Sequence, residues 1–416
     1  MIDRPSGGER VVLVHIHFPT GKMEEDLNEF KELAEAAGAE VAAIITGTRR
    51  VPDAKYFVGS GKAEEIRDVA QSVNAQLVIF NHVLTPAQER NIESLVKARA
   101  VDRTGLILDI FAQRARSFEG KLQVELAQLK HLATRLVRGW THLERQRGGI
   151  GLRGPGETQL ETDRRLIRDK IKMIMSRLAK SRQQRELGRR ARKRATIPTV
   201  ALVGYTNAGK STLFNRLTGA SVYTANQLFA TLDPTLRRVD FPKLGPVILA
   251  DTVGFIRHLP HDLVQAFHGT LEEVSSADLL IHVVDVGDTQ REAHIEQVDH
   301  VLSEINAQEI PRLVVFNKID LIPTLSPKLD RGDQGEVKRV LISASLGLGM
   351  AELMQAVSEE LGQEMVEHEL ILPPQESKLR ALLYARKAVL SEAIDEEGKY
   401  HLLVRLPRVE LEKLFR

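Results

Sequence analysis

The sequence contains no cysteine among its 416 residues. Without cysteine there can be no disulfide, no Cys-ligated zinc and no thiol nucleophile, and this composition fits a reducing compartment. No run of about 18 apolar residues occurs either. The first ten residues, MIDRPSGGER, lack an apolar core of signal-peptide length. We therefore expect a cytoplasmic protein with no membrane span.

The net charge of +2 conceals an uneven distribution of charge along the chain. Between Arg135 and Arg194 there are 19 Lys/Arg residues against 6 Asp/Glu residues, an excess of 13 positive charges. The rest of the chain therefore carries a net charge of −11. One strongly basic segment in an acidic protein is typical of a surface that faces a polyanion. A pair of solvated charged helices is the alternative explanation.

Apolar runs alternate with helical patterns near the N-terminus. Strands are expected at residues 11–18, 40–48 and 76–80, and helices at residues 23–37, from about Lys62, and at residues 86–98. This alternation predicts a parallel or mixed sheet that is covered by helices. We assign residues 1–120 to an N-terminal α/β domain.

A helical hairpin is expected at residues 121–195. Leucines recur at helical spacing from Leu122 to Leu136, and a second amphipathic pattern covers residues 162–190. Between them the string GGIGLRGPGET breaks the helix, because six of its residues are glycine or proline. Two helices joined in this way predict an antiparallel pair. Since the hairpin contains the basic segment, we expect it to bind RNA.

A second series of alternating strands and helices predicts a doubly wound α/β domain at residues 196–365. Its strands are expected in the strings TVALVG, GPVILADT, ADLLIHVVDV, RLVVFNKID and KRVLISAS. Its helices are expected after Lys210 and from Leu263, Arg291 and Gly349. Residues 366–416 are assigned to a small C-terminal domain, with a linker near Leu372, a helix from Ser377 and a strand at residues 401–406.

A phosphate-binding loop (P-loop) is indicated at residues 204–211. The strand TVALVG runs into GYTNAGKS, and a helical segment follows, so the pattern GxxxxGK[ST] occurs in its required context. The glycines let backbone N–H groups point at phosphate, and the helix N-terminus adds positive charge. Lys210 is expected to bridge the β- and γ-phosphates, and the Ser211 hydroxyl to bind Mg²⁺.

Two further patterns follow the P-loop at strand ends. Asp251 and Gly254 form DxxG, in which the carboxylate suits the water shell of Mg²⁺ and the glycine lets a backbone N–H approach the γ-phosphate. Asn317, Lys318 and Asp320 belong to NKID. The Asp320 carboxylate can accept from guanine N1–H and the exocyclic amine at once, and adenine offers no such pair of donors. Asn317 is expected to tie this loop to the P-loop, and the Lys318 stem to cover the base.

The hydroxyl that orders with the γ-phosphate is sought between Tyr223 and Thr235. Thr231, in FATLD, is our candidate for the second Mg²⁺-binding hydroxyl. Thr224 and Thr235 are rivals, and a role for Thr231 in a plain turn is also open. Residues 343–345, Ser-Ala-Ser after a strand, offer a backbone amide for guanine O6.

These patterns predict a site for GTP or GDP. Catalytic roles are expected for Lys210, Thr231 and Gly254, and metal binding for Ser211 and Thr231. The nucleotide is expected to contact Gly204, Tyr205, Thr206, Asn207, Ala208, Gly209, Lys210, Ser211, Thr212, Phe229, Ala230, Thr231, Leu232, Asp233, Asp251, Thr252, Val253, Gly254, Asn317, Lys318, Ile319, Asp320, Ser343, Ala344 and Ser345.

Several strings together resemble the HflX family of bacterial ribosome-associated GTPases. They are GYTNAGKSTLFNRLT, FATLDPT, DTVGFI and NKID, with GGIGLRGPGETQLETDRR ahead of them. The last string is the most specific to the family, and the resemblance covers nearly the whole chain. It implies an α/β fold in which a Ras-like P-loop GTPase domain follows a small α/β domain and a basic helical hairpin and precedes a small α+β tail.

The resemblance also implies a function. It implies GTP hydrolysis with Mg²⁺, binding to the large (50S) ribosomal subunit and its rRNA, and splitting of stalled or idle ribosomes under stress. A GTPase switch in ribosome assembly or RNA modification is the alternative, although the sequence shows no Cys nucleophile or metal cluster for a second reaction. A pure binding module that never turns the nucleotide over is a third class. We expect a monomer.

Two residues bear on the rate of hydrolysis. Phe255 occupies the place where many Ras-like GTPases carry a glutamine that positions water, so intrinsic hydrolysis is expected to be slow unless another residue supplies the polar group. Asn207 occupies the P-loop position that helps to hold K⁺ in related potassium-activated GTPases. A K⁺ ion there could neutralise charge in the transition state, and stabilisation of the loop is the alternative role for Asn207.

Overall fold

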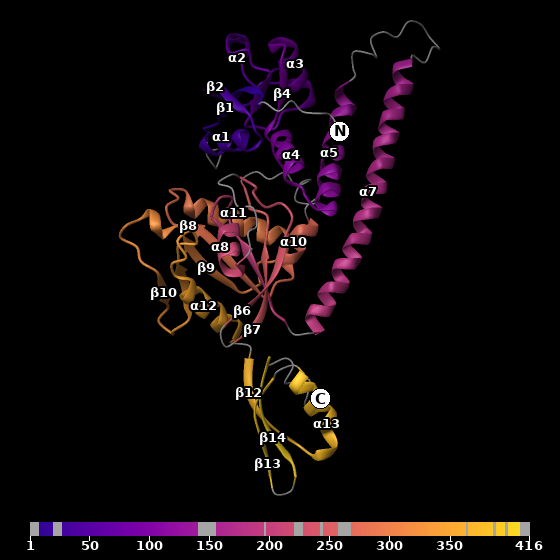
Figure 1. Ribbon diagram of the computed structural model, residues 1–416. Coiled ribbons are helices and arrows are strands. Elements are labelled where there is room, and N and C mark those ends of the chain that lie inside the picture. The colour runs from indigo at the N-terminus through magenta and orange to yellow at the C-terminus, as the bar shows by residue number, and fades with distance from the viewer. Residues whose placement is uncertain are drawn as a thin grey trace.

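The protein folds into three α/β units and a pair of long helices that runs along one side (Figure 1). The computed structural model describes residues 8–19, 27–139, 155–194, 197–219, 228–241, 244–256, 268–362, 365–385, 388–395 and 398–407. Three sheets of four, seven and three strands occur within these residues. The α/β class predicted from the sequence is confirmed. Among the described residues, no helix has the length and apolarity needed to cross a membrane.

The N-terminal unit is a parallel sheet in the order β2-β1-β3-β4. Alternate residues of β1 enter opposite cores, because Val11 and Leu13 pack in one apolar cluster and Val12 and Val14 in another. The elements are β1 (Arg10–His17), α1 (Leu27–Ala36), β2 (Glu40–Thr48), α2 (Ser60–Ser72), β3 (Leu77–Phe80), α3 (Pro86–Val96), β4 (Arg99–Val101) and α4 (Arg103–Arg114). The sequence analysis missed β4, which has only three residues, and α4.

The predicted pair of helices is present as α5 (Phe118–Gly139) and α7 (Pro155–Arg194). Leu122 and Leu126 of α5 and Ile174 of α7 form a buried apolar seam between them. The expected start of the second helix at residue 162 is wrong, since α7 begins at Pro155. Proline fits the first turn of a helix because its missing N–H would have no partner there. The connection at residues 140–154, including most of the glycine-rich string, lies outside the described residues.

The central unit is a seven-stranded sheet in the order β10-β11-β9-β8-β5-β7-β6. Its elements are β5 (Thr199–Val203), α8 (Lys210–Thr218), β6 (Thr235–Phe241), β7 (Gly245–Asp251), α10 (His268–Ser275), β8 (Leu279–Asp285), α11 (Arg291–Glu304), β9 (Arg312–Asn317), β10 (Lys328–Arg331), β11 (Val337–Leu341) and α12 (Met350–Gly362). The sequence analysis missed β6 and β10, the two edge strands, which pair antiparallel. The helix expected from Leu263 begins among residues outside the description.

The C-terminal unit is a three-stranded antiparallel sheet packed against one helix. Its elements are β12 (Met365–Leu372), α13 (Ser377–Ala385), β13 (Val389–Ile394) and β14 (Tyr400–Pro407), in the strand order β12-β14-β13. The sequence analysis missed β12 and β13. The linker expected near Leu372 follows the last residue of β12.

Parallel strands bring the sequence motifs to one edge of the central sheet. Strands β5, β7, β8 and β9 run parallel and are neighbours, so their carboxyl ends lie together. The P-loop follows β5, Asp251 ends β7 and Asn317 ends β9. This edge is where open α/β sheets bind ligands.

Candidate nucleotide-binding site

The backbone between β5 and α8 has the conformation of a loop that wraps an anion. Gly204 has φ 146° and Gly209 has φ 94°, and Asn207 adopts the left-handed conformation with φ 59°. A Cβ atom at Gly204 would overlap the carbonyl oxygen of Val283, and one at Gly209 would overlap Nδ2 of Asn317. Both positions therefore require glycine. The loop ends at the N-terminus of α8, where free N–H groups favour a phosphate.

The Lys210 side chain is buried across this loop. Its Nζ donates to the carbonyl oxygens of Gly204 at 3.0 Å and Tyr205 at 2.7 Å. Burial lowers the pKa of Lys210 to about 8, and the nearby charge of Asp251 opposes this shift. A phosphate group in the loop would provide the negative charge that the buried ammonium lacks.

Three oxygen-bearing side chains meet next to Lys210. Oδ2 of Asp251 accepts from the hydroxyls of Ser211 at 2.8 Å and Thr231 at 2.9 Å, and the two hydroxyls lie 2.7 Å apart. The Asp251 side chain is fully buried, and within the described residues its Oδ1 has no hydrogen-bond partner. Burial raises the pKa of Asp251, while its hydrogen bonds and Lys210 lower it.

This donor set fits Mg²⁺. Hydroxyl and carboxylate oxygens are the ligands that Mg²⁺ takes beside phosphate and water, and the unpartnered Oδ1 of Asp251 could accept from such a water. Ser211 and Thr231 are the residues that would hold the ion. No group of three His, Cys, Asp or Glu side chains suited to a metal occurs in the part of the chain that the structure describes.

Of the two rival threonines, the structure describes only Thr235. Thr235 lies at the start of β6, opposite Asp251 in the antiparallel register. Tyr223 and Thr224 lie outside the described residues. Among the described residues of this segment, Thr231 has its hydroxyl beside that of Ser211.

The segment after Asp251 is fixed against the P-loop by its backbone. Phe255 N–H donates to the carbonyl oxygen of Gly204 at 3.2 Å, and the Phe255 carbonyl accepts from Thr206 N–H at 2.8 Å. A Cβ atom at Gly254 would lie 3.0 Å from Lys210 Nζ, so glycine allows this close approach. The Phe255 ring itself is 2% exposed and packs in the core under β5 and β8.

Asn317 joins three loops. Its Nδ2 donates to the carbonyl oxygen of Ala208 in the P-loop at 2.9 Å, and its Oδ1 accepts from Ala344 N–H at 2.9 Å. The side chain is 2% exposed, so these bonds are shielded from water. The Ala344 amide, one of the amides expected to bind guanine O6, is thus bonded within the protein.

The carboxylate expected to recognise guanine is oriented by a neighbouring loop. Oδ1 of Asp320 accepts from the Ser343 hydroxyl at 2.5 Å, and the Ser345 hydroxyl lies 3.4 Å from the same oxygen. Lys318 adopts φ 66° and its Nζ pairs with Oδ2 of Asp285 at 2.8 Å. The NKID residues and residues 343–345 therefore lie side by side at the ends of β9 and β11.

The residues around Thr231 contact the N-terminal half of the molecule. The Phe229 ring packs edge-on against Phe111 of α4, with 4.6 Å between ring centroids. Leu232 is buried in the same apolar cluster. The Asp233 carboxylate, which we expected at the nucleotide, binds the segment that leads into α5 through Arg116 and Ser117.

The remaining predicted residues have supporting positions. The Thr252 hydroxyl donates to the carbonyl oxygen of Leu202 at 2.5 Å. Val253 and Ile319 are buried. Thr212 lies in the first turn of α8, and Ala230 precedes Thr231.

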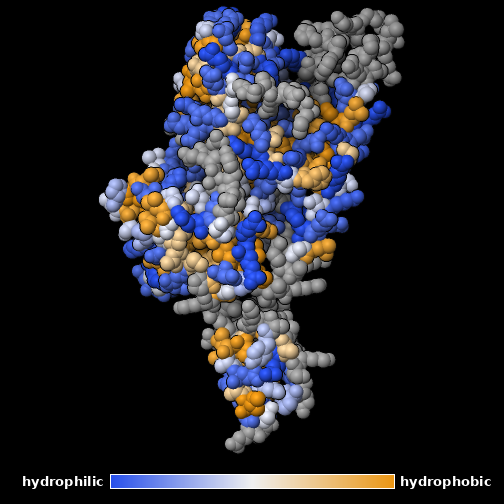
Figure 2. Space-filling view, viewed as in Figure 1, coloured by the Kyte–Doolittle hydropathy of each residue, from blue (hydrophilic) through white to orange (hydrophobic). Residues whose placement is uncertain are grey.

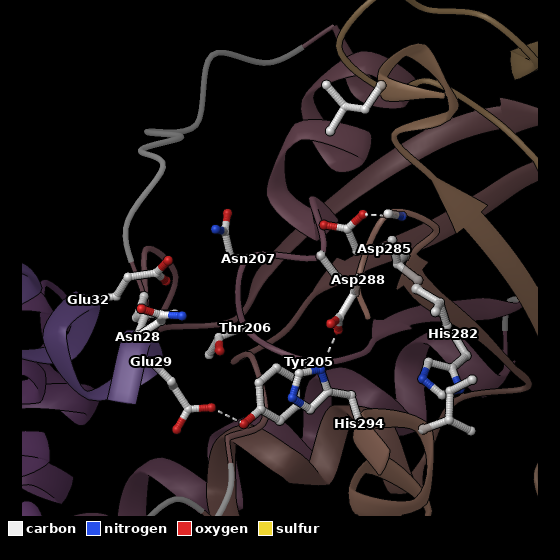
Figure 3. A pocket seen from close by; sticks show the side chains of 17 residues that line it. Asn28, Glu29, Glu32, Tyr205, Thr206, Asn207, His282, Asp285, Asp288 and His294 are labelled. Carbon is white, nitrogen blue, oxygen red and sulfur yellow. Dashed lines mark hydrogen bonds and ion pairs between the residues drawn. The ribbon is translucent and has the colours of Figure 1, made fainter. Parts of the chain in front are cut away.

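Sequence reasoning missed a cavity of about 280 Å³ between the P-loop and α1 (Figure 3). The Tyr205 hydroxyl donates to Glu29 of α1, and the Tyr205 ring stacks on His294 of α11, 3.8 Å between centroids and 13° between planes. Glu29 also pairs with Arg103 at 2.5 Å. Glu29 is 176 positions from Tyr205 along the chain, so no local pattern could have indicated this contact.

The fold and the site define a P-loop GTPase, and comparison with known proteins agrees. Residues 24–112 match the family model described as GTP-binding GTPase N-terminal, residues 114–192 the GTP-binding GTPase Middle Region, and residues 199–318 the 50S ribosome-binding GTPase model. The matches support a GTPase that binds guanine nucleotide.

Relatives along the full length identify the family. The chain is 58% identical to GTPase HflX of Escherichia coli K12 over 414 residues, which cover 100% of this chain and 97% of the relative. It is 48% identical to GTPase HflX of Caldanaerobacter subterraneus over 390 residues, 94% of this chain and 89% of the relative. A solved GTP-binding protein from Sulfolobus solfataricus in complex with GDP shares 25% identity at a TM-score of 0.45 and covers 85% of this chain and 99% of its own. The chain belongs to the HflX family of GTPases.

Proposed function

We propose that this protein is a ribosome-associated factor that binds the 50S subunit and its rRNA, dissociates ribosomes under stress, and hydrolyses GTP slowly until ribosomes stimulate it. The observation that carries the proposal is the basic helix α7. It lies beside the central unit, β5 to α12, which we call the nucleotide-binding unit (Figure 1). The match of residues 199–318 to the 50S ribosome-binding GTPase model supports the choice of partner. We further propose that the protein acts in the cytoplasm as a monomer.

Helix α7 packs against α5 through apolar side chains and exposes basic side chains to solvent. Ile174 is 1% exposed in the seam with α5, whereas Arg165, Arg168 and Lys172 are exposed. Figure 2 shows mainly hydrophilic side chains, with a few apolar ones, along the side where α7 lies. Arginine pairs with phosphate through two parallel hydrogen bonds and stacks on unpaired bases, so this face suits structured RNA.

The chain's own residues account for nucleotide binding and for part of the hydrolysis. Lys210 would hold the β- and γ-phosphates, and the backbone N–H of Gly254 would approach the γ-phosphate. Mg²⁺, held by Ser211 and Thr231, would neutralise negative charge on the phosphates. The buried Phe255 ring cannot orient water, which supports slow hydrolysis by the isolated protein. We also propose K⁺ beside Asn207 as a further source of positive charge.

Deletion of residues 148–156 tests the proposal, because it removes most of the glycine-rich string between α5 and α7, with the first two residues of α7, and no residue of the nucleotide-binding unit. The variant is expected to keep the wild-type affinity for GTP and the wild-type rate of intrinsic hydrolysis. It should no longer split 70S ribosomes into subunits, as measured by light scattering. Ribosomes should also stimulate its GTP hydrolysis less than that of the wild type. Splitting at the wild-type rate by the deletion variant would show that the hairpin is only a spacer.

A second experiment tests the choice of partner. Co-sedimentation with isolated 30S and 50S subunits, in the presence of a GTP analogue or GDP, identifies the partner directly. We expect binding to 50S subunits in the GTP-analogue form. Binding to 30S subunits alone would refute the proposed partner.

A further inference from the structure

The start of α5 is held by a residue from the nucleotide-binding unit. Oδ2 of Asp233 accepts from the backbone N–H groups of Arg116 at 2.8 Å and Ser117 at 2.7 Å, and Oδ1 accepts from the Ser117 hydroxyl at 2.5 Å. The Ser117 hydroxyl in turn accepts from Gly120 N–H at 2.8 Å, in the first turn of the helix. The Gly120 N–H has no carbonyl partner within α5, so the Ser117 hydroxyl caps the helix, and Asp233 holds the residues that carry this cap.

Asp233 is linked to the proposed Mg²⁺ site by a very short stretch of chain. Thr231, two residues earlier, bonds to Ser211 and Asp251. Two residues of extended chain span at most about 7 Å. Leu232, between them, is 2% exposed and fixed in an apolar cluster, so the connection has little slack.

The same cluster contains residues from both sides of the nucleotide site. Phe229 and Leu232 come from residues 228–233, which we call the first switch segment, and Val253 and Ile256 come from residues 252–256, the second switch segment. All four belong to the same cluster as Phe111 of α4, whose ring contacts that of Phe229. Both switch segments are thus packed against the elements that lead into the hairpin.

The second helix of the hairpin has its own contact with the nucleotide-binding unit. Arg182 of α7 forms an ion pair of 2.7 Å with Glu272 of α10, the helix that follows the second switch segment in the chain. In the same part of α7, the Ser181 hydroxyl donates to Glu119 of α5 at 2.6 Å, and Arg185 also pairs with Glu119. The two helices are therefore joined to each other where they meet the nucleotide-binding unit.

Towards its other end, α5 is joined to the N-terminal unit. Arg135 lies between Glu89 of α3 and Asp102, which caps α4, with 2.8 Å to each carboxylate. The Asp102 side chain is fully buried, and that of Arg135 is 18% exposed. A charged pair with this burial resists separation, so α5 moves with the N-terminal unit.

We infer that the base of the hairpin is a joint through which the occupant of the nucleotide site sets the orientation of the RNA-binding helices, and that Asp233 is its positioning residue. When Thr231 is drawn to a metal-bound triphosphate, Asp233 holds the start of α5; when Thr231 is released, the cap loosens. Coupling of this kind is reciprocal, so RNA that fixes the hairpin also favours the ordered position of Thr231. The RNA partner rests on the proposed function, whereas the coupling within the chain does not.

Hydrogen exchange of the isolated protein tests the coupling without ribosomes and without turnover. The measurement compares the peptide at residues 116–126 in the GDP-bound and GTP-analogue-bound protein, both with Mg²⁺. In the wild type we expect exchange about tenfold slower with the analogue, the factor that an ordinary N-cap contributes. In Asp233→Ala we expect fast exchange that is the same with both nucleotides. No nucleotide dependence in the wild type, or an unchanged dependence in Asp233→Ala, would overturn the inference.

Two further variants guard against a general loss of structure. Asp240→Ala removes an exposed carboxylate from β6, downstream of Asp233, and should keep the full tenfold difference. Ser117→Ala removes one of the three bonds to Asp233 together with the hydroxyl that caps Gly120 N–H, and should reduce the difference to about threefold. Loss of the difference in Asp240→Ala would overturn the specific role of Asp233, as would a full difference in Ser117→Ala.

Binding to 50S subunits separates this inference from the proposed function. In the wild type the GTP-analogue form should bind more tightly than the GDP form, and in Asp233→Ala the two dissociation constants should become equal. If the wild type shows nucleotide-dependent exchange but no affinity for 50S subunits, the proposed function fails and the coupling stands. If it binds 50S subunits with nucleotide dependence that Asp233→Ala preserves, the coupling fails and the proposed function stands.

Discussion

Asn317 and Ala208 lie 109 positions apart, yet the Asn317 side chain donates to the Ala208 carbonyl oxygen at 2.9 Å in a buried environment. The bond fixes the spacing between the loop that should hold the base and the loop that should hold the phosphates. Because Asn317 and not Asp320 makes this connection, a change at Asp320 can alter base recognition without moving the P-loop. We therefore expect the two proposed roles of the NKID loop to be separable by mutation.

Asp320→Asn should exchange guanine for xanthine specificity. The amide that replaces the carboxylate cannot accept both guanine protons, so we expect a loss of GTP affinity of about 3 kcal/mol, or more than a hundredfold. Xanthine nucleotides, whose N1/C2 edge suits an amide better, should bind more tightly to Asp320→Asn than to the wild type. Fluorescent-nucleotide titration measures both affinities. GTP affinity equal to that of the wild type would mean that Asp320 does not contact the base.

Nucleotide affinity should depend on pH through Lys210. Its pKa in the free protein is about 8, below the ordinary value of 10.5, so the nucleotide-free site loses its proton first. Because phosphate favours the charged ammonium, GDP affinity should be constant below pH 8 and fall up to about tenfold per pH unit above it. Calorimetry in buffers of different ionisation enthalpy should show uptake of nearly one proton at pH 9 and little at pH 7. Equal uptake at the two pH values would contradict this assignment.

The same pKa predicts the stability of the nucleotide-free protein. Between pH 8 and 10.5 the unfolded chain, with its ordinary lysine, binds more protons than the folded protein. The free energy of unfolding should therefore gain a rising contribution from Lys210 as the pH increases through this range. Denaturant unfolding of Lys210→Met, which lacks the titrating group, should show a smaller rise than the wild type. The same rise in the free energy of unfolding in both proteins would refute the assignment of this effect to Lys210.

Hydrolysis should be faster in K⁺ than in Na⁺ at equal ionic strength. Asn207 lines a cavity together with Glu29 and Glu32 of α1 (Figure 3). The test variant is Asn207→Gly, because glycine accepts the left-handed backbone at φ 59° and lacks only the side chain. It should lose the preference for K⁺. Equal rates of the wild type in the two salts, with and without ribosomes, would remove the idea.

Charge on α7 should govern how binding to 50S subunits depends on salt. Replacement of Arg165, Arg168 and Lys172 by glutamine should weaken binding at low salt. The plot of the logarithm of the association constant against the logarithm of the salt concentration should become less steep, by about 0.7–0.9 for each phosphate contact that is lost. Arg331→Gln, which removes one positive charge paired with Glu359 in the nucleotide-binding unit, is the control and should leave the slope unchanged. An unchanged slope in the triple variant would exclude phosphate contacts by this face.

The sequence predicts best what local patterns determine. The P-loop, DxxG and NKID residues could be found because each motif has a characteristic spacing and follows a strand. The edge strands β6 and β10 were missed because TLRRVDF and KLDR carry charged residues on the exposed side and lack a continuous apolar run. The contacts of Tyr205 with Glu29 and of Asp233 with Ser117 could not be predicted from local patterns. The first pair is separated by 176 positions in the sequence and the second by 116 positions.

Helix α7 has 40 residues, and at about 1.5 Å per residue it is about 60 Å long. Its Arg194 end adjoins the nucleotide-binding unit, and its Pro155 end is the one farthest away along this rod (Figure 1). A tilt of about 5° at the base would carry the far end through about 5 Å, by the geometry of a rod of that length. This distance exceeds the ~3.4 Å rise between stacked base pairs. The joint inferred above would make this helix a lever arm, because a rearrangement of atomic size at the nucleotide site would become a displacement of several ångströms at its far end.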